Sequence, residues 1–256
     1  MNILFTICGR AGSKGCKNKN MKEFLGSPLL YFTISCIDIF KKTYKEQFGA
    51  MDICVNSDSL ELLDLVKKVN QNIELINRDA SLAGDSIGKV DVIKNSVDII
   101  EDRLNNKYDL VIDLDITSPL RVAHDVKRAI DEKLRDRDKN VVFSVVPSRR
   151  NPYFNMVQDI EGDYKMIIES TYLTRQEAPQ TYDMNASIYV YEREALRDEK
   201  LKTLFEGACG AITMTDTAVL DIDSEEDFEL MQVVAEHFMS KNSEMKAIID
   251  NIKEIV

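Results

Sequence analysis

The chain has 256 residues, of which 44% are hydrophobic, and its formal net charge is −11. This length and apolar content are enough for one large α/β domain with its own core and argue against two equal domains. The negative charge argues against binding to nucleic acid or to an anionic membrane, so any phosphate must be bound by a local site.

The first segment, MNILFTIC, contains a short apolar run without a basic leader. The run is too short for a signal sequence or a membrane span, so we expect a cytoplasmic protein. Five cysteines are scattered without a CxxC pair, which is typical of reduced thiols and argues against a zinc site. His124 and His237 lie far apart, which argues against a histidine metal centre or a Ser-His-Asp triad.

The segment GRAGSKGCKNKN, residues 9–20, follows the first predicted strand and joins three glycines to a run of cations. Its spacing fits neither the Walker A loop nor the dinucleotide-binding fingerprint. Backbone N–H groups of a glycine-rich loop, together with the charges of Arg10 and Lys14, nevertheless favour a phosphate-binding loop. A solvated basic loop is the alternative reading, but the glycines, the single sign of charge and the strand-end position coincide here.

Short apolar runs then alternate with amphipathic stretches. This alternation predicts βαβ units with a mostly parallel central sheet and helices on both faces. Ligands of such a sheet bind at the carboxyl ends of its strands. In DLDITSPLR, which follows one predicted strand, Asp113 and Asp115 could face a ligand. Arg121 could bind an anion or support the fold, and we expect the structural role.

The alternation of strands and helices stops after NVVFSVVPS. The segment NPYFNMVQDIEGDYKMIIES has a polar turn between two short runs in which apolar and polar residues alternate. This pattern predicts a β-hairpin insertion. The next segment, TRQEAPQTYDMNASIYV, concentrates Arg175, Gln176, Tyr182 and Asn185 before a strand. Such polar density fits either ligand contact or a subunit contact. The final segment, SEMKAIIDNIKEIV, predicts one more amphipathic helix.

The segment LDIDSEEDF places Asp221 and Asp223 on the same side of an extended chain. Two carboxylates suit Mg²⁺, which prefers hard oxygen ligands. Alternatively, Asp223 or Ser224 caps the helix that starts at Glu225, with Asp227 completing a capping box. The phosphate-binding loop favours the metal, because nucleotidyl transfer needs cations to neutralise a triphosphate.

Four ordered motifs resemble those of the CMP-sialic acid synthetases, cytidylyltransferases that activate nine-carbon α-keto acids. The motifs are RAGSKGCKNKN, LDITSPLR, TRQEAPQTYDMNASIYV and DIDSEEDF, and the resemblance covers nearly the whole chain. It implies one cytidylyltransferase domain, 1–256, with a mixed, mostly parallel sheet of nucleotide-diphospho-sugar transferase type. It also implies a homodimer, with a dimerisation insertion at about 145–183, and an extra C-terminal helix at about 242–256.

The same resemblance assigns the candidate site residues. CTP would be bound by Arg10, Gly12, Ser13, Lys14, Asn20 and Arg78, the sugar by Asp115, Arg175, Gln176 and Asn185, and Mg²⁺ by Asp221 and Asp223. Arg10, Lys14 and Asp223 would be catalytic. Three departures from the family pattern lie at the sugar end: Asp115 replaces glutamine, Ile116 replaces proline, and Ala186 replaces a glycine.

The reaction implied is attack of the acceptor's anomeric 2-hydroxyl on the α-phosphate of CTP, with release of pyrophosphate. The segments RRNPYFNMV and YDMNASIYV are most similar to those of family members associated with legionaminic acid. Legionaminic or N-acetylneuraminic acid is therefore the expected acceptor. The alternatives are a CMP-Kdo-type synthetase and a non-catalytic nucleotide-binding relative.

Overall fold

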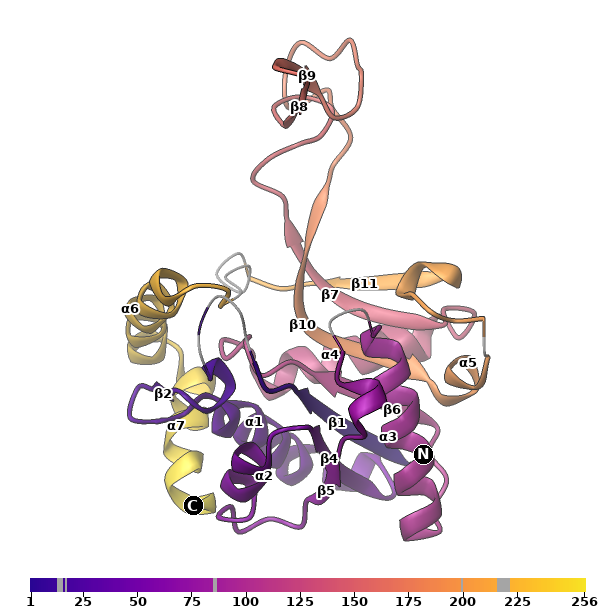
Figure 1. Cartoon of the computed structure of the whole chain (residues 1–256), viewed down its shortest axis with the longest axis vertical. Helices are drawn as coiled ribbons and strands as arrows, with labels where there is room; N and C mark the ends of the chain where they lie inside the picture. Colours follow the sequence, from indigo (N-terminus) through magenta and orange to yellow (C-terminus); the bar gives the residue numbers. More distant parts are fainter. Residues whose placement is uncertain (13–15, 17, 85–86, 199, 216–221) are drawn as a thin grey trace.

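The computed structural model describes residues 1–12, 16, 18–84, 87–198, 200–215 and 222–256. A seven-stranded sheet with the order β11-β7-β10-β6-β1-β4-β5 forms its centre (Figure 1). The strands are β1 (Ile3–Gly9), β4 (Met51–Ser57), β5 (Glu74–Asn77), β6 (Leu110–Leu114), β7 (Val141–Pro147), β10 (Tyr182–Glu192) and β11 (Cys209–Thr213).

Most neighbouring strands run parallel. β1 pairs in parallel with β4 and β6, β4 with β5, and β11 with β7. β10 is the exception, because it lies antiparallel between β6 and β7. The sheet is therefore mixed and mostly parallel, which confirms the expected fold class.

Continuous apolar strands make both faces of this sheet suitable for burial. In β1, Ile3, Phe5 and Ile7 pack into one core and Leu4 packs into the other, because alternate side chains point to opposite faces. The first core is covered by α1 (Leu29–Tyr44), α2 (Leu60–Val66), α4 (Ala123–Arg135), α6 (Glu225–Lys241) and α7 (Ser243–Ile255). The second is covered by α3 (Lys89–Leu104) and α5 (Arg193–Arg197).

Short elements join these layers. They are the β2 (Glu23–Phe24) and β3 (Ser27–Pro28) hairpin and the 3-10 helices η1 (Lys19–Met21), η2 (Lys45–Gln47), η3 (Ala80–Leu82) and η4 (Leu204–Glu206). At the end of the chain, α7 packs against α1, where Ser35 Oγ donates a 2.8 Å hydrogen bond to Ile248 O. In the described part of the chain, no helix has both the length and the apolarity of a membrane span.

Residues 148–181, here called the arm, stand out from the sheet between β7 and β10 (Figure 1). The outer part of the arm carries the hairpin of β8 (Val157–Ile160) and β9 (Asp163–Met166). Its turn is the predicted one, and Glu161 and Gly162 adopt φ values of 55° and 88°, as a tight hairpin turn with positive φ at both central residues requires. Exposed apolar side chains cover the arm: Met156, Val157, Ile160, Tyr164, Ile167, Ile168, Tyr172 and Leu173.

Candidate active site

The basic loop begins at the carboxyl end of β1, where parallel β4 and β6 end beside it. Ala11 N donates a 2.8 Å hydrogen bond to Asp58 Oδ1, which ties the loop to the end of β4. A side chain at Gly9 would require Leu62 and Ile116 to shift, because a Cβ there would lie 2.9 Å from Leu62 Cδ1 and 3.1 Å from Ile116 Cδ1. The carboxyl ends of β1, β4 and β6 thus lie side by side at the edge of the sheet where ligands of α/β folds bind.

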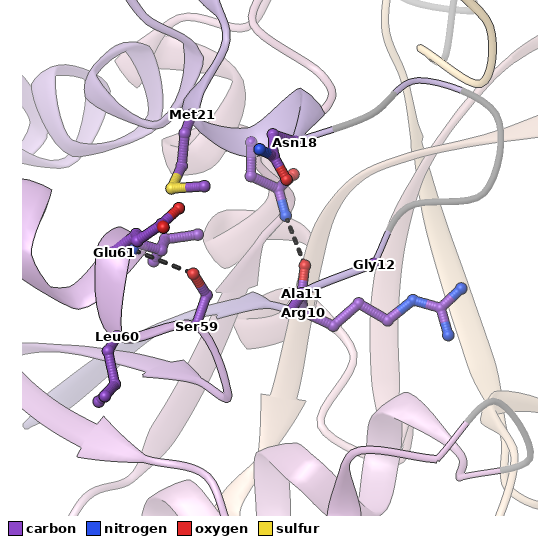
Figure 2. Close-up of a pocket in the computed structure, with 10 residues that line it drawn as sticks. Arg10, Ala11, Gly12, Asn18, Met21, Ser59, Leu60 and Glu61 are labelled. Atoms are coloured by element: carbon purple, nitrogen blue, oxygen red, sulfur yellow. Dashed lines mark hydrogen bonds between the residues drawn. The ribbon is translucent and has the colours of Figure 1, made fainter.

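A cavity of about 400 Å³ opens between this loop and the start of α2 (Figure 2). Its lining comprises Arg10, Ala11, Gly12, Asn18, Asn20, Met21, Ser59, Leu60, Glu61 and Leu62. Apolar walls with a few polar groups are typical of sites for small organic ligands. The candidate nucleotide residues Arg10, Gly12 and Asn20 are thus brought together, whereas Ser13 and Lys14 lie outside the described residues.

The α2 side of the cavity was not among the sequence-derived candidates. Ser59 caps α2 by accepting a 3.2 Å hydrogen bond from Leu62 N, and Glu61 follows in the first helical turn. The signal in the sequence was the polar SDS segment directly after the apolar strand of β4. Such a segment lies at the same edge as the basic loop because β1 and β4 are parallel.

Arg78 lies beside the cavity and is 9% exposed. Its Nε donates to Asn56 Oδ1, and its Nη2 donates to the carbonyl oxygens of Gly9 and Asn56, each at 2.8 Å. The guanidinium therefore fastens the ends of β1 and β4 to each other. It thereby holds the strand end from which the basic loop starts.

The acidic segment before α6 reaches the basic loop. Lys19 Nζ lies 3.2 Å from Asp223 Oδ1. The capping box of α6 is formed by Ser224 and Asp227, since Asp227 N donates to Ser224 Oγ at 3.0 Å and Ser224 N donates to Asp227 Oδ2 at 2.8 Å. The Asp223 side chain is 79% exposed and its carboxylate takes no part in the box. Asp221 lies outside the described residues.

A lysine and two carboxylates meet at the carboxyl end of β6. Lys89, the first residue of α3, has its Nζ 2.8 Å from Asp113 Oδ2 and 2.7 Å from Asp115 Oδ2. The same ammonium lies 5.1 Å from the centroid of the Tyr189 ring. Asp113 is fully buried, whereas the side chains of Asp115 and Lys89 are 23% and 34% exposed.

Hydrogen bonds hold both carboxylates in place. Asp115 Oδ1 accepts from the backbone N and the Oγ1 of Thr117, at 3.1 and 2.9 Å, and Asp113 Oδ1 accepts from Thr6 Oγ1 at 2.8 Å. Burial alone would raise the pKa of Asp115, but the Lys89 ammonium and the Thr117 hydrogen bonds outweigh burial and hold this pKa at about 2. Burial likewise opposes the charge on Lys89, but the two carboxylates raise the pKa of its ammonium well above the usual value.

Arg121 supports the fold from within the core, as expected. It is 1% exposed, and its guanidinium donates to Ser187 O at 3.0 Å and to Thr33 Oγ1 at 2.5 Å. Thr33 Oγ1 in turn donates to Asp115 O at 3.1 Å, so Arg121 is linked to the acidic strand end. Burial lowers the pKa of this guanidinium.

The remaining sugar-binding candidates are divided between the sheet and the arm. Asn185 is 3% exposed in β10, and both ends of its amide are bonded: Ser144 Oγ donates to Oδ1 at 2.6 Å, and Nδ2 lies 3.3 Å from Met214 Sδ. Arg175 and Gln176 are exposed on the arm, where Arg175 Nη2 donates to Ser148 O at 2.7 Å. Asp115 directly follows β6 and Asn185 lies in β10, whereas Arg175 and Gln176 lie on the arm.

A sequence model of the family described as Cytidylyltransferase matches residues 4–246. The chain belongs to the cytidylyltransferase family. It is 31% identical to the post-translational flagellin modification protein B of Campylobacter coli, over 96% of this chain and 97% of that protein. It is 34% identical to the CMP-N,N'-diacetyllegionaminic acid synthase of Campylobacter jejuni, over 90% of this chain and 93% of that protein.

A solved structure of a CMP:2-keto-3-deoxy-manno-octonic acid synthetase complexed with CTP has the same fold as this cytidylyltransferase. The TM-score is 0.62, over 93% of this chain and 99% of that chain. Since the identity is 15%, this likeness concerns the fold alone. The family match makes the protein a nucleotidyltransferase and confirms the resemblance drawn from its motifs.

Proposed function

We propose that this cytidylyltransferase transfers CMP from CTP to the anomeric 2-hydroxyl of a nonulosonic acid and releases pyrophosphate, with legionaminic or N-acetylneuraminic acid as acceptor. The observation that carries the proposal is the contact of Asp223 with Lys19, which lies in the chain between the cavity-lining residues Asn18 and Asn20. It joins a cationic, glycine-rich loop to an exposed carboxylate at the start of α6. The similarity to a CMP-N,N'-diacetyllegionaminic acid synthase supports the choice of acceptor.

In this proposal the basic loop binds CTP. Arg10, Gly12 and Asn20 line the cavity, and Ser13 and Lys14 follow within the same loop. Negative charge on the phosphate oxygens grows during the transfer, and fixed cations and N–H donors stabilise it without having to reorganise. Arg10 and Lys14 would therefore act on the transition state, while Arg78 holds the strand ends from which the loop starts.

Mg²⁺ would be held by Asp223 together with Asp221. Asp223 suits this role because its carboxylate is exposed and the helix cap is complete without it. A hard oxygen donor next to a phosphate-binding loop is what this cation prefers. When bound, Mg²⁺ supplies positive charge that neutralises the phosphates.

The nucleophile is the acceptor hydroxyl, so no covalent enzyme intermediate is required. Asp115 is a poor proton acceptor, because its pKa of about 2 lies far below neutral pH. Catalysis would therefore rest on positioning the hydroxyl in line with the leaving pyrophosphate and on stabilising charge.

The arm would make the protein a homodimer. A row of exposed apolar side chains on a projecting segment is typical of a protein interface. Arg175 and Gln176 lie on this segment, so in a dimer they would reach the sugar end of the partner's site. There, Arg175 would bind the acceptor carboxylate, and Gln176 would contact hydroxyl or amide groups. Asn185 would contact the sugar directly only by exchanging one of its internal bonds.

Pyrophosphate release tests the proposal. The protein is incubated with CTP, Mg²⁺ and, in separate reactions, legionaminic acid, N-acetylneuraminic acid and Kdo. Turnover with a nonulosonic acid is the expected result. Turnover with Kdo alone would identify a CMP-Kdo-type synthetase. Tight binding of CTP without pyrophosphate release from any acid would identify a non-catalytic relative.

A further inference from the structure

Lys89 and Asp115 form an ion pair that faces the ligand-binding edge of the sheet. Both side chains are partly exposed, at 34% and 23%, whereas Asp113 beneath them has no exposed surface. Ile116, the residue after Asp115, lies against Gly9, where the basic loop begins. The pair therefore lies at the same edge of the sheet as the start of the loop that would bind CTP.

We propose that Lys89 is a specificity-determining residue that, paired with Asp115, contacts neutral hydroxyl or amide groups of the sugar acceptor. The inference rests on the proposed function and adds to it a residue that the sequence motifs do not include. It also assigns the pair to one part of the acceptor: its neutral polar groups and not its carboxylate.

Hydrogen-bonding capacity supports this role. Of the three N–H donors of Lys89, one is used on Asp115 Oδ2, while Asp113 Oδ2 and the Tyr189 ring lie close to the same ammonium. Asp115 Oδ1 is occupied by two bonds from Thr117, but Oδ2 accepts only the Lys89 bond among the described residues. The pair thus retains capacity to donate from Lys89 and to accept at Asp115.

Geometry restricts what can bind there. The N–H and C=O of one secondary amide point in opposite directions, so a single amide cannot satisfy both partners. Two adjacent groups of the acceptor are needed, one that accepts from Lys89 and one that donates to Asp115. Neighbouring hydroxyl and acetamido groups on a sugar chain provide such a combination.

Charge restricts the ligand further. Lys89, Asp113 and Asp115 together carry a net charge of −1, since two carboxylates face one ammonium. A second carboxylate, such as that of the acceptor, would gain little at this position, because Asp113 and Asp115 already compensate the charges of Lys89 and the buried Arg121. The acceptor carboxylate would therefore bind elsewhere, which agrees with the role proposed for Arg175.

Asp113 explains why the ammonium is fixed. Its Oδ2 is buried and receives no aligned hydrogen bond within the described part of the chain, so its charge depends on Lys89 at 2.8 Å. A buried carboxylate that loses its nearest cation is costly. This dependence holds Lys89 in place and, through it, the carboxylate of Asp115.

The test compares Lys89→Met, Lys89→Arg and the double variant Lys89→Met with Asp113→Asn. The double variant keeps the net charge of the cluster at −1 and avoids an uncompensated Asp113. We expect Lys89→Met and the double variant to raise KM for the acceptor about tenfold or more, because a charged hydrogen bond is lost. KM for CTP should stay within about twofold. Lys89→Arg should recover most of the acceptor affinity.

Lys42→Met is the matched control. Lys42 Nζ lies 2.7 Å from Asp38 Oδ2, another buried carboxylate, but on α1 near α7. Lys42→Met should lower thermal stability and leave both KM values unchanged. If Lys89→Met does not fold, the acceptor KM values of the double variant and of Lys89→Arg test the inference.

Unchanged acceptor KM in the folded double variant, or equal increases in both KM values, would overturn the inference. Normal turnover by the wild type would then leave the proposed function standing. A wild-type protein that turns over no ulosonic acid would overturn the proposed function and this inference with it.

Discussion

Lys19 Nζ lies 3.2 Å from Asp223 Oδ1, although the two residues are 204 positions apart in the chain. This contact closes the candidate site on one side, because it joins the basic loop after β1 to the segment that precedes α6. The ammonium pairs with the carboxylate that is proposed to bind Mg²⁺.

Asp223→Ala should reduce the rate of pyrophosphate release by about 10²-fold or more, on the order of 3 kcal/mol of transition-state stabilisation. The reason is the loss of one of the two carboxylates proposed to hold Mg²⁺. The rate is measured at saturating CTP and acceptor over a series of Mg²⁺ concentrations. Glu226→Ala, an exposed acidic residue in the first turn of α6, is the control and should retain its rate. A near-normal rate for Asp223→Ala would remove this residue from the proposed site.

The arm should hold two copies of the chain together. Leu173 is 85% exposed on the arm, so Leu173→Asp should convert a dimer into a monomer by placing a charge in an apolar interface. The measurement is molar mass by light scattering. Leu230→Asp, at a 52% exposed leucine on α6, should leave the molar mass unchanged. A monomeric wild-type protein would contradict the proposal.

Arg121→Met should destabilise the protein by about 3 kcal/mol, because it removes a buried cation that attracts Asp113 and Asp115 and breaks its hydrogen bonds to Ser187 O and Thr33 Oγ1. The measurement is the free energy of unfolding in urea. Arg128→Met, in the helix α4 that follows Arg121, is the control; its ion pair with Asp125, in which the arginine side chain is 42% exposed, should contribute less than about 1 kcal/mol. Equal effects of the two substitutions would contradict the structural role of Arg121.

Asp115 should contribute to acid sensitivity. Its pKa falls from 3.8 to about 2 on folding, so the stabilisation is complete above the unfolded pKa and is lost as pH falls through the folded value. The advantage of the wild type over Asp115→Asn in free energy of unfolding should shrink by about 2 kcal/mol between about pH 5 and about pH 2. Urea titrations at several pH values measure it, and a pH-independent difference would contradict the ion pair.

Ala186→Gly should stabilise the protein by about 0.5–1 kcal/mol. Ala186 has a φ of 48°, where the register of β10 against β7 shifts, and glycine tolerates this conformation best. The control is Ala211→Gly in β11, which should destabilise because it loosens an ordinary strand. A loss of stability in Ala186→Gly would show that strain at this position is not relieved by glycine.

Much of the fold could be predicted from the sequence, because alternating apolar and amphipathic segments determine a covered parallel sheet. The loop after β1 was also predictable, since glycines and cations of one sign stood next to each other at a strand end. The place of β10 between β6 and β7 was not visible in its apolar pattern, because strand order depends on pairing between distant segments.

The ion pair of Lys89 and Asp115 could not be predicted in the same way. The two residues are 26 positions apart. In the sequence, Lys89 is an ordinary residue at the start of a helix, and Asp115 is an ordinary residue after a strand. Only the sheet topology places the start of α3 over the end of β6. The contacts of Arg78 could not be predicted from the sequence either, because they depend on Gly9 and Asn56 lying side by side.

Ser148 N donates a 3.0 Å hydrogen bond to Thr181 O, so the chain leaves the sheet and re-enters it at adjacent points. A short turn could join these points without changing the register in which Tyr182 faces Pro147. The length and composition of the arm can therefore change during evolution without altering the sheet or the strand ends that form the site. The fold of the sheet is thus independent of the arm, whereas the proposed sugar contacts of Arg175 and Gln176 would change with it.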